Sequence, residues 1–178
     1  PESGFVSGPW DGFYTALYQV NSLIVALDKL AASQSRNEIL GVASFFRGLI
    51  YYHLVSRYGE VPILEAPFSG DIAASTEEEG WSFVEKNFQV AIDYAPTFSD
   101  KYYVSKQAAK ALMARTKLAQ GKLTEAAKLA EEVIGDANFS LADFDQIFRG
   151  KANREEIFSF VNLLNESSVN LSASLYSR

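Results

Sequence analysis

The sequence predicts an all-α domain built from helical hairpins. Apolar residues recur every three or four positions along several long stretches, and glycines, prolines and capping residues separate these stretches. Residues 43–58 are apolar on nearly every side, which is typical of a helix buried between neighbours. The chain has 178 residues, 48% of them hydrophobic, enough for one domain with a core.

The first predicted hairpin spans residues 10–58. Residues 1–9 are rich in Gly, Ser and Pro and are expected to form a loop. A helix over 10–32 carries one apolar stripe: Phe13, Leu17, Val20, Ile24, Leu27 and Ala31. After a turn at 33–36, a central helix runs over 37–58, where Gly59 can adopt the left-handed conformation and Pro62 prevents continuation.

The second predicted hairpin region spans residues 76–135. Thr76 with Glu79 and Ser75 with Glu78 both fit a capping-box pattern, which opens a helix ending at Pro96. Ser105 caps a helix that runs to Gln120, and a turn at 121–122 leads into another helix over 124–135. A short helix is expected at 143–149 and a strand at 155–161, followed by an irregular tail.

Alanine is concentrated in the two helices of 105–135. Small residues at facing positions let two helices approach closely, as stacked helical hairpins require. The pattern of small and apolar residues from Met113 to Ala130 resembles a tetratricopeptide repeat. We therefore expect tetratricopeptide-like hairpins that form an α–α superhelix, with a short irregular or β-like C-terminal tail.

Composition excludes several classes of function. The formal charge of −6 leaves no basic patch for nucleic acid. No cysteine is present and His53 is the single histidine, which leaves only carboxylates for metal binding or acid–base chemistry. No phosphate loop or hydrolase motif occurs. We predict no catalysis, no metal and no cofactor, and interpret His53 as a core histidine. No run of apolar residues is long enough to predict a membrane span.

Two groups of side chains are candidates for specific roles. Trp10, Asp11 and Tyr14 could bind a sugar, because aromatic rings stack on the apolar faces of sugars and carboxylates bind their hydroxyl groups; packing of the aromatic residues is the competing interpretation. Arg47 lies among apolar residues and needs acceptors, for which Asn21 and Asp28 on the preceding helix are suited. We expect these three to be structural polar anchors.

Several blocks in order along the chain resemble the SusD-like (RagB/SusD) family of surface nutrient-binding lipoproteins of Bacteroidota. They are Trp10-x-x-x-Tyr14 with Asn21, the segments 46–52 and 58–62, and then Lys106 to Arg115, Gly121 to Ala126, and Glu155 to Phe158. The resemblance implies tetratricopeptide-like hairpins and an N-terminal lipid anchor, which is outside this sequence. We expect 1–178 to be one helical domain and a fragment of a longer chain.

The resemblance also implies a function. Members capture oligosaccharides or other nutrients at the outer membrane, on the cell surface, and deliver them to a partner SusC-like TonB-dependent transporter. By this resemblance the protein would bind glycans without catalysis and contact the membrane only through its lipid anchor. The alternative is a tetratricopeptide scaffold that binds a protein or peptide segment, which would need a run of charged and polar residues along its concave face.

Overall fold

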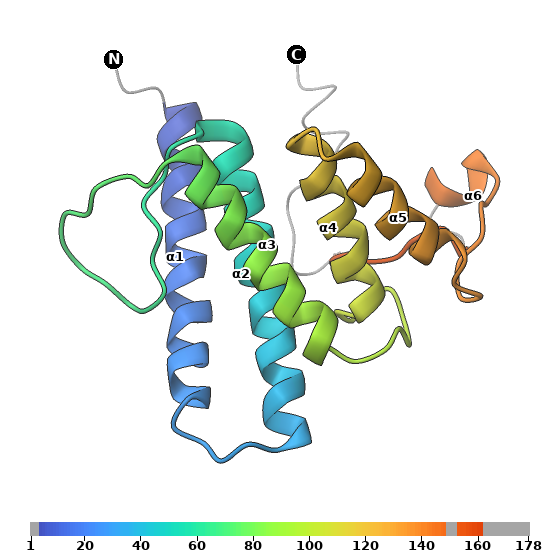
Figure 1. The fold of residues 1–178 in the computed structure, drawn as a ribbon, viewed down its shortest axis with the longest axis horizontal. Helices are drawn as coiled ribbons and strands as arrows, with labels where there is room; N and C mark the ends of the chain where they lie inside the picture. Colours follow the sequence, from blue (N-terminus) through green and yellow to red (C-terminus); the bar gives the residue numbers. More distant parts are fainter. Residues whose placement is uncertain (1–3, 149–152, 162–178) are drawn as a thin grey trace.

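The computed structural model describes residues 4–148 and 153–161 and confirms the all-α class (Figure 1). Six helices occur in the described part of the chain: α1 (Gly4–Leu27), α2 (Gln34–Tyr58), α3 (Glu77–Tyr94), α4 (Lys106–Ala119), α5 (Leu123–Ile134) and α6 (Phe144–Phe148). No strand occurs among these residues, and the one β-bridge joins Val61 to Ser75.

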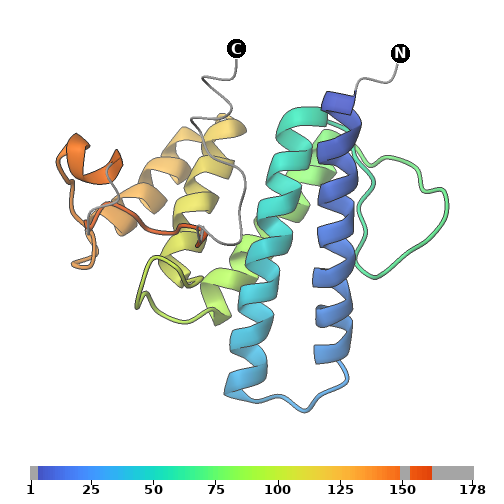
Figure 2. The same cartoon turned by 180° about the vertical axis from the view of Figure 1, so that it is seen from behind.

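Helix α2 is the centre of the arrangement. It packs against α1 on one side and α3 on the other, while α4 packs against α3 and α5. Figure 1 shows α1 and α2 as an antiparallel pair, with α3 crossing α2 and the α4–α5 pair beyond it. The loop between α2 and α3 projects beside α1 in both views (Figures 1 and 2).

Side chains at three helix starts accept backbone hydrogen bonds, as the sequence predicts for Thr76 and Ser105 but not for Ser33, which it places in a turn. Ser33 and Ser105 accept hydrogen bonds from backbone amides three residues later. Thr76 and Glu79 form the predicted capping box, with Thr76 Oγ1 accepting from the Glu79 amide at 3.2 Å and Glu79 Oε2 accepting from the Thr76 amide at 2.9 Å. Gly59 and Gly121 have positive φ values of 70° and 73°, which favour glycine at these turns.

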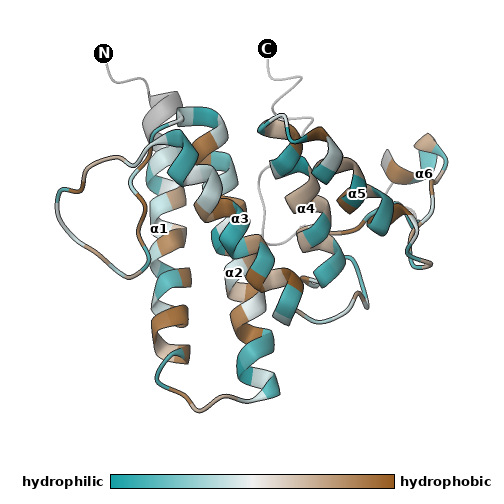
Figure 3. Ribbon diagram, in the orientation of Figure 1, coloured by the Kyte–Doolittle hydropathy of each residue, from teal (hydrophilic) through white to brown (hydrophobic). Residues whose placement is uncertain are grey.

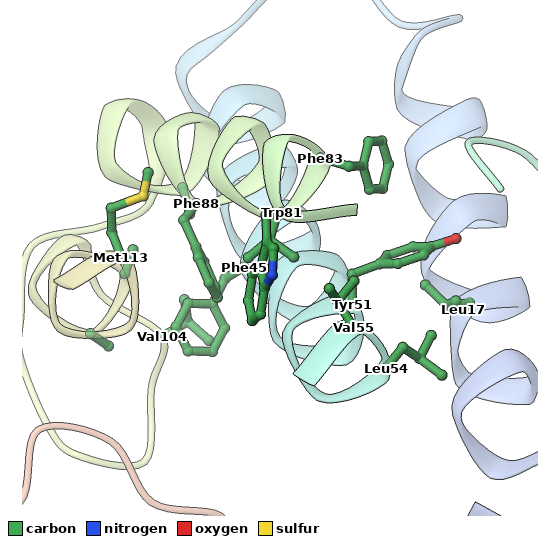
Figure 4. Packing of buried hydrophobic residues seen from close by; sticks show 14 of the residues in the cluster. Leu17, Phe45, Tyr51, Leu54, Val55, Trp81, Phe83, Phe88, Val104 and Met113 are labelled. Carbon is green, nitrogen blue, oxygen red and sulfur yellow. The ribbon is translucent and has the colours of Figure 1, made fainter. Parts of the chain in front are cut away.

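The core forms where α2 meets its neighbours (Figure 4). Phe45, Phe88 and Met113 lie between α2, α3 and α4, whereas Leu17 and Tyr51 lie between α1 and α2. Hydrophobic and hydrophilic residues interchange along the helices, as expected where each helix turns one side toward a core (Figure 3). By length and composition alone α2 could cross a membrane, but half of its most apolar window is buried inside the protein, and core helices meet the same criterion.

Two glycines allow α3 to approach α2 closely. A Cβ atom at Gly41 would lie 2.3 Å from the Ala95 backbone nitrogen, and one at Gly48 would lie 2.9 Å from the Phe88 ring. Any larger side chain would therefore push α3 and its C-terminal end away from α2. Helix α2 is apolar on several sides. Where it approaches α3 most closely, it carries glycine instead of a larger apolar residue.

Three predicted helix boundaries and one predicted strand are wrong. Helix α2 begins at Gln34 instead of residue 37, because Ser33 caps it, so 34–36 are helical and not part of a turn. Helix α1 begins at Gly4 instead of residue 10, and it contains Pro9 although an interior proline removes one backbone hydrogen bond. It ends at Leu27 instead of residue 32, because the Leu27 carbonyl accepts from Arg36 Nε at 3.1 Å and the chain then turns. The segment 155–161 is no strand, since its one backbone bond to another segment within the described residues joins the Ser159 amide to the Lys101 carbonyl.

Candidate functional site

The predicted sugar-binding residues lie together on the first turns of α1. Trp10, Asp11 and Tyr14 line an open hollow of about 610 Å³. The other lining residues are Thr15, Tyr18 and Gln19. These three were not predicted from the sequence, although spacings of four residues from Asp11 and Tyr14 place Thr15 and Tyr18 on the same side of a helix. The hollow therefore presents aromatic, carboxylate, hydroxyl and amide groups to solvent.

Aromatic packing fixes the ring positions in this hollow. The Trp10 ring centroid lies 4.9 Å from that of Tyr14 and 5.0 Å from that of Tyr58, the latter edge to face. Trp10 is half-buried by these contacts, while Tyr18 and Asp11 are exposed. The packing interpretation and the binding interpretation of Trp10 are thus compatible, because Trp10 packs against Tyr14 and Tyr58 and still lines the hollow.

The Tyr14 hydroxyl holds the loop after α2. It donates a hydrogen bond of 2.9 Å to the Pro62 carbonyl, which also accepts from the Tyr51 hydroxyl at 3.2 Å. The Tyr51 oxygen in turn accepts from the Leu64 amide at 2.7 Å. Burial raises the pKa of Tyr14, and burial also raises the pKa of Tyr51, to about 12. Tyr14 therefore offers its ring to the hollow, while its hydroxyl is engaged elsewhere.

Arg47 is buried and bonded to two asparagines. Its Nε donates to Asn87 Oδ1 at 2.6 Å, and its Nη1 donates to Asn21 Oδ1 at 3.3 Å. The guanidinium also lies 5.3 Å from the centroid of the Phe83 ring. Burial lowers the pKa of Arg47, and nearby acidic charge partly offsets this effect. Asn87, which the sequence did not single out, is thus an Arg47 acceptor contributed by α3.

The side-chain amide nitrogen of each asparagine also donates a hydrogen bond. Asn21 Nδ2 donates to the Leu64 carbonyl at 2.8 Å, and Asn87 Nδ2 donates to the Phe83 carbonyl at 2.8 Å. The predicted pairing of Asp28 with Arg47 is wrong. Asp28 lies after the end of α1, exposed, where its carboxylate accepts from Arg36 Nη2 at 3.2 Å. Asp28 lies about two helical turns beyond Asn21, which is the α1 residue that reaches Arg47.

Charged side chains surround a second hollow, of about 520 Å³, between α3, α4 and α5. Glu85 accepts hydrogen bonds from Lys117 and Lys122 at 2.9 Å each and from Gln120 at 2.7 Å. Lys117 also pairs with Glu125 at 2.8 Å. Burial alone would raise the pKa of Glu85, but these hydrogen bonds lower it overall. The charges of this hollow are therefore largely paired within the protein.

The alanine-rich helices border a third, apolar hollow. Its volume is about 530 Å³, and α4 and α5 supply most of its lining. Leu118 and Leu123 are 59% and 64% exposed at this surface. Its other lining residues include Ala111, Ala114, Ala127 and Ala130. Among the residues that the structure describes, no cluster of three or more acidic or histidine side chains is arranged to hold a metal ion.

Comparison with known proteins identifies the family. A SusD-like family model, described as starch-binding and associating with the outer membrane, matches residues 5–118. The chain belongs to this SusD-like family. The SusD-like protein P2 of Formosa agariphila is 28% identical over 158 residues, covering 83% of this chain and 31% of that protein. This SusD-like chain thus spans about a third of the length of the curated relatives it matches.

Solved structures share the helical fold of this SusD-like chain. A SusD-like carbohydrate-binding protein of Bacteroides fragilis matches with a TM-score of 0.80 at 22% identity, over 86% of this chain and 33% of that one. A laminarin-binding SusD-like protein matches with a TM-score of 0.78 at 24% identity, over 84% of this chain and 36% of that one. The predicted all-α, tetratricopeptide-like architecture is confirmed.

Proposed function

We propose that this SusD-like chain takes part in non-catalytic capture of oligosaccharides at the cell surface. The observation that carries the proposal is the open aromatic hollow on α1, in a chain whose family is described as starch-binding and associated with the outer membrane. Two structural neighbours support a glycan as the ligand class: one is described as laminarin-binding, and another was crystallised with a xylogluco-oligosaccharide.

The residues of the hollow supply the interactions that a sugar needs. The rings of Trp10, Tyr14 and Tyr18 line the hollow and offer apolar surface on which a sugar can stack. The exposed Asp11 carboxylate and the Gln19 amide can accept and donate hydrogen bonds to sugar hydroxyl groups. Since the Trp10 ring is positioned by Tyr14 and Tyr58, it needs little ordering on binding, which favours affinity.

Transport forms the second part of the proposal. We infer that the longer protein is held at the outer membrane by a lipid anchor outside this sequence and passes its glycan to a SusC-like TonB-dependent transporter. Family membership supports this role. Absence of catalysis is proposed because His53 stacks against Phe13, at 6.0 Å between ring centroids, and is the single histidine of the chain.

The alternative is a scaffold that binds a peptide. The charged hollow between α3, α4 and α5 gives this alternative a surface that the sequence did not predict. Glu85, Lys117 and Glu125 of this hollow are already in ion pairs, so a peptide that used them would have to break those pairs before it could bind. Glycan capture at α1 therefore remains the better-supported function.

The test measures oligosaccharide binding by calorimetry. Laminarin and xyloglucan oligosaccharides are titrated into the wild type and into the Asp11→Asn and Tyr18→Ala variants, both at exposed positions. We expect each variant to bind about tenfold more weakly, with an unchanged melting temperature. Tyr94→Ala, at a 43% exposed tyrosine outside the hollow, is the matched control. Binding that is equal in all variants would exclude the α1 hollow as the site.

A further inference from the structure

A fourth hollow lies beside the loop between α3 and α4. Its volume is about 290 Å³, and three distant parts of the chain border it: α2, residues 96–104 and residues 158–161. Figure 2 shows segment 153–161, in orange-red, passing alongside α4 toward α2. The hollow is therefore separate from the one formed by the first turns of α1.

Phenylalanine rings form the wall of this hollow. The Phe158 centroid lies 6.3 Å from that of Phe46 and 5.2 Å from that of Phe160, and Phe46 and Phe160 are 6.4 Å apart. Phe158 is also 5.1 Å from Phe45, which has no exposed surface. The wall is thus continuous with the core, so its rings are held in place before any ligand arrives.

Exposed aromatic rings form the rim. Tyr103 and Phe160 are each 67% exposed, and Tyr102 is 47% exposed. Within the described part of the chain the Tyr103 side chain makes no hydrogen bond, so its hydroxyl is available. Three large rings are thus accessible around one hollow, and grouped exposed rings of this kind can mark a ligand-binding surface.

Hydrogen bonds fix the rim on both sides. The Tyr102 amide donates to Asp100 Oδ1 at 2.9 Å, and the Tyr103 amide donates to the Asp100 carbonyl at 3.2 Å. The Ser159 amide donates to the Lys101 carbonyl at 2.8 Å, which joins the two sides of the hollow. The exposed tyrosines therefore project from a loop with a defined backbone.

Charged groups lie next to these rings. Lys101 forms an ion pair with Glu156, and its Nζ lies 5.2 Å from the centroid of the Tyr102 ring. The Asp100 carboxylate is exposed beside them. These charged groups lie beside the hollow and outside its lining, which combines aromatic and apolar side chains with the hydroxyl groups of Tyr102, Tyr103 and Ser159.

We propose that this hollow is a second carbohydrate contact, which binds one sugar ring of an oligosaccharide by stacking on Tyr103 and Phe160. The proposal rests on the oligosaccharide-binding function proposed above. Tyrosine at the rim favours a sugar over an apolar partner, because its ring stacks while its hydroxyl bonds. The volume of about 290 Å³ is close to the lower end of the range for small-molecule pockets, which suits a single sugar ring.

The experiment titrates laminarin and xyloglucan oligosaccharides into the wild type and the Tyr103→Ala, Phe160→Ala and Tyr103→Phe variants. We expect the two alanine variants to bind about tenfold more weakly, and Tyr103→Phe to retain most of the affinity because its ring remains. Tyr94→Ala is again the control, and the melting temperatures should be unchanged.

Each result has one meaning. If the wild type binds and the Tyr103 and Phe160 variants bind equally well, this second contact is wrong while the proposed function stands. If the wild type binds neither the laminarin nor the xyloglucan oligosaccharides, both fail together. If Asp11→Asn and Tyr103→Ala each weaken binding, and more so in combination, one glycan contacts two separate hollows.

Discussion

At the scale of single residues, Arg47 joins three helices through two amide oxygens. It lies on α2, and its partners Asn21 and Asn87 come from α1 and α3. A neutral amide satisfies the guanidinium without a second buried charge, and each asparagine also bonds a backbone carbonyl. This arrangement fixes the relative positions of the helices that carry the core.

We expect the Arg47→Met variant to lose about 2 kcal/mol of unfolding free energy, because two buried acceptor oxygens remain without donors. Urea denaturation measures the loss. Arg57→Met, at an exposed position of the same helix, is the control and should change the stability little. An Arg47→Met variant as stable as the wild type would show that the contacts contribute no net stability.

His53 gives a measurable effect of pH. Burial lowers its pKa, and the positive charges of Arg57 and Arg115 lower it further. A lowered pKa in the folded state means that the neutral form stabilises the fold. That contribution is complete above pH about 6.5 and is lost as the pH falls through the folded-state pKa.

The measurement is an NMR titration of the one histidine in the chain. We expect a pKa below the ordinary value, and a higher pKa in the Arg57→Gln variant because one nearby positive charge is removed. A pKa at or above the ordinary value would contradict the burial of the ring against Phe13.

At the scale of elements, the close contact between α2 and α3 depends on glycine. Gly41 lies against the end of α3, where a methyl group would meet the Ala95 backbone nitrogen at 2.3 Å. Backbone cannot move aside as a flexible side chain can. The N-terminal half of α2 and the last turn of α3 are therefore locked in contact.

We expect Gly41→Ala to destabilise the protein by about 2 kcal/mol, because overpacking outweighs the gain of about 1 kcal/mol in helix propensity. Gly12→Ala is the matched control. Nothing lies within 4 Å of a Cβ at Gly12 on α1, so that variant should gain up to about 1 kcal/mol. Thermal and urea unfolding of both variants measure the difference. Equal changes in stability would show that the α2–α3 contact does not require glycine at position 41.

Most elements follow from local patterns that the sequence contains. Capping residues at 76 and 105 mark two helix starts, and apolar spacing marks the core sides, whereas the cap at Ser33 lies in a segment predicted as a turn. The failures arise where distant contacts decide. Residues 155–161 alternate like a strand but find no sheet in the described chain, and instead place Phe158 against Phe45. Asn87 was missed as an acceptor because nothing local shows that α3 faces Arg47.

At the scale of the whole molecule, the segment 153–161 packs against the central helix α2. Phe158 lies more than a hundred positions after Phe45 and Phe46, yet packs against both rings. Lys101 and Glu156 pair across the same junction. The segment therefore depends on the helices before it, and the fourth hollow exists only when the two are joined.

We expect Phe158→Ala to lower the unfolding free energy by about 2 kcal/mol, since the ring is half-buried and leaves a gap against α2. Amide exchange should quicken at 153–161 and at the Lys101 turn, because the Ser159 amide bonds the Lys101 carbonyl. Phe160→Ala, at a 67% exposed ring in the same segment, should leave stability and exchange nearly unchanged.

The pair of variants separates packing from binding. Phe158→Ala should weaken oligosaccharide binding at the fourth hollow by releasing the segment, whereas Phe160→Ala should weaken it with the segment still in place. Equal exchange rates at 153–161 in the wild type and Phe158→Ala would mean that other contacts hold the segment. In that case the hollow would persist without Phe158, and its rim residues alone would determine the affinity.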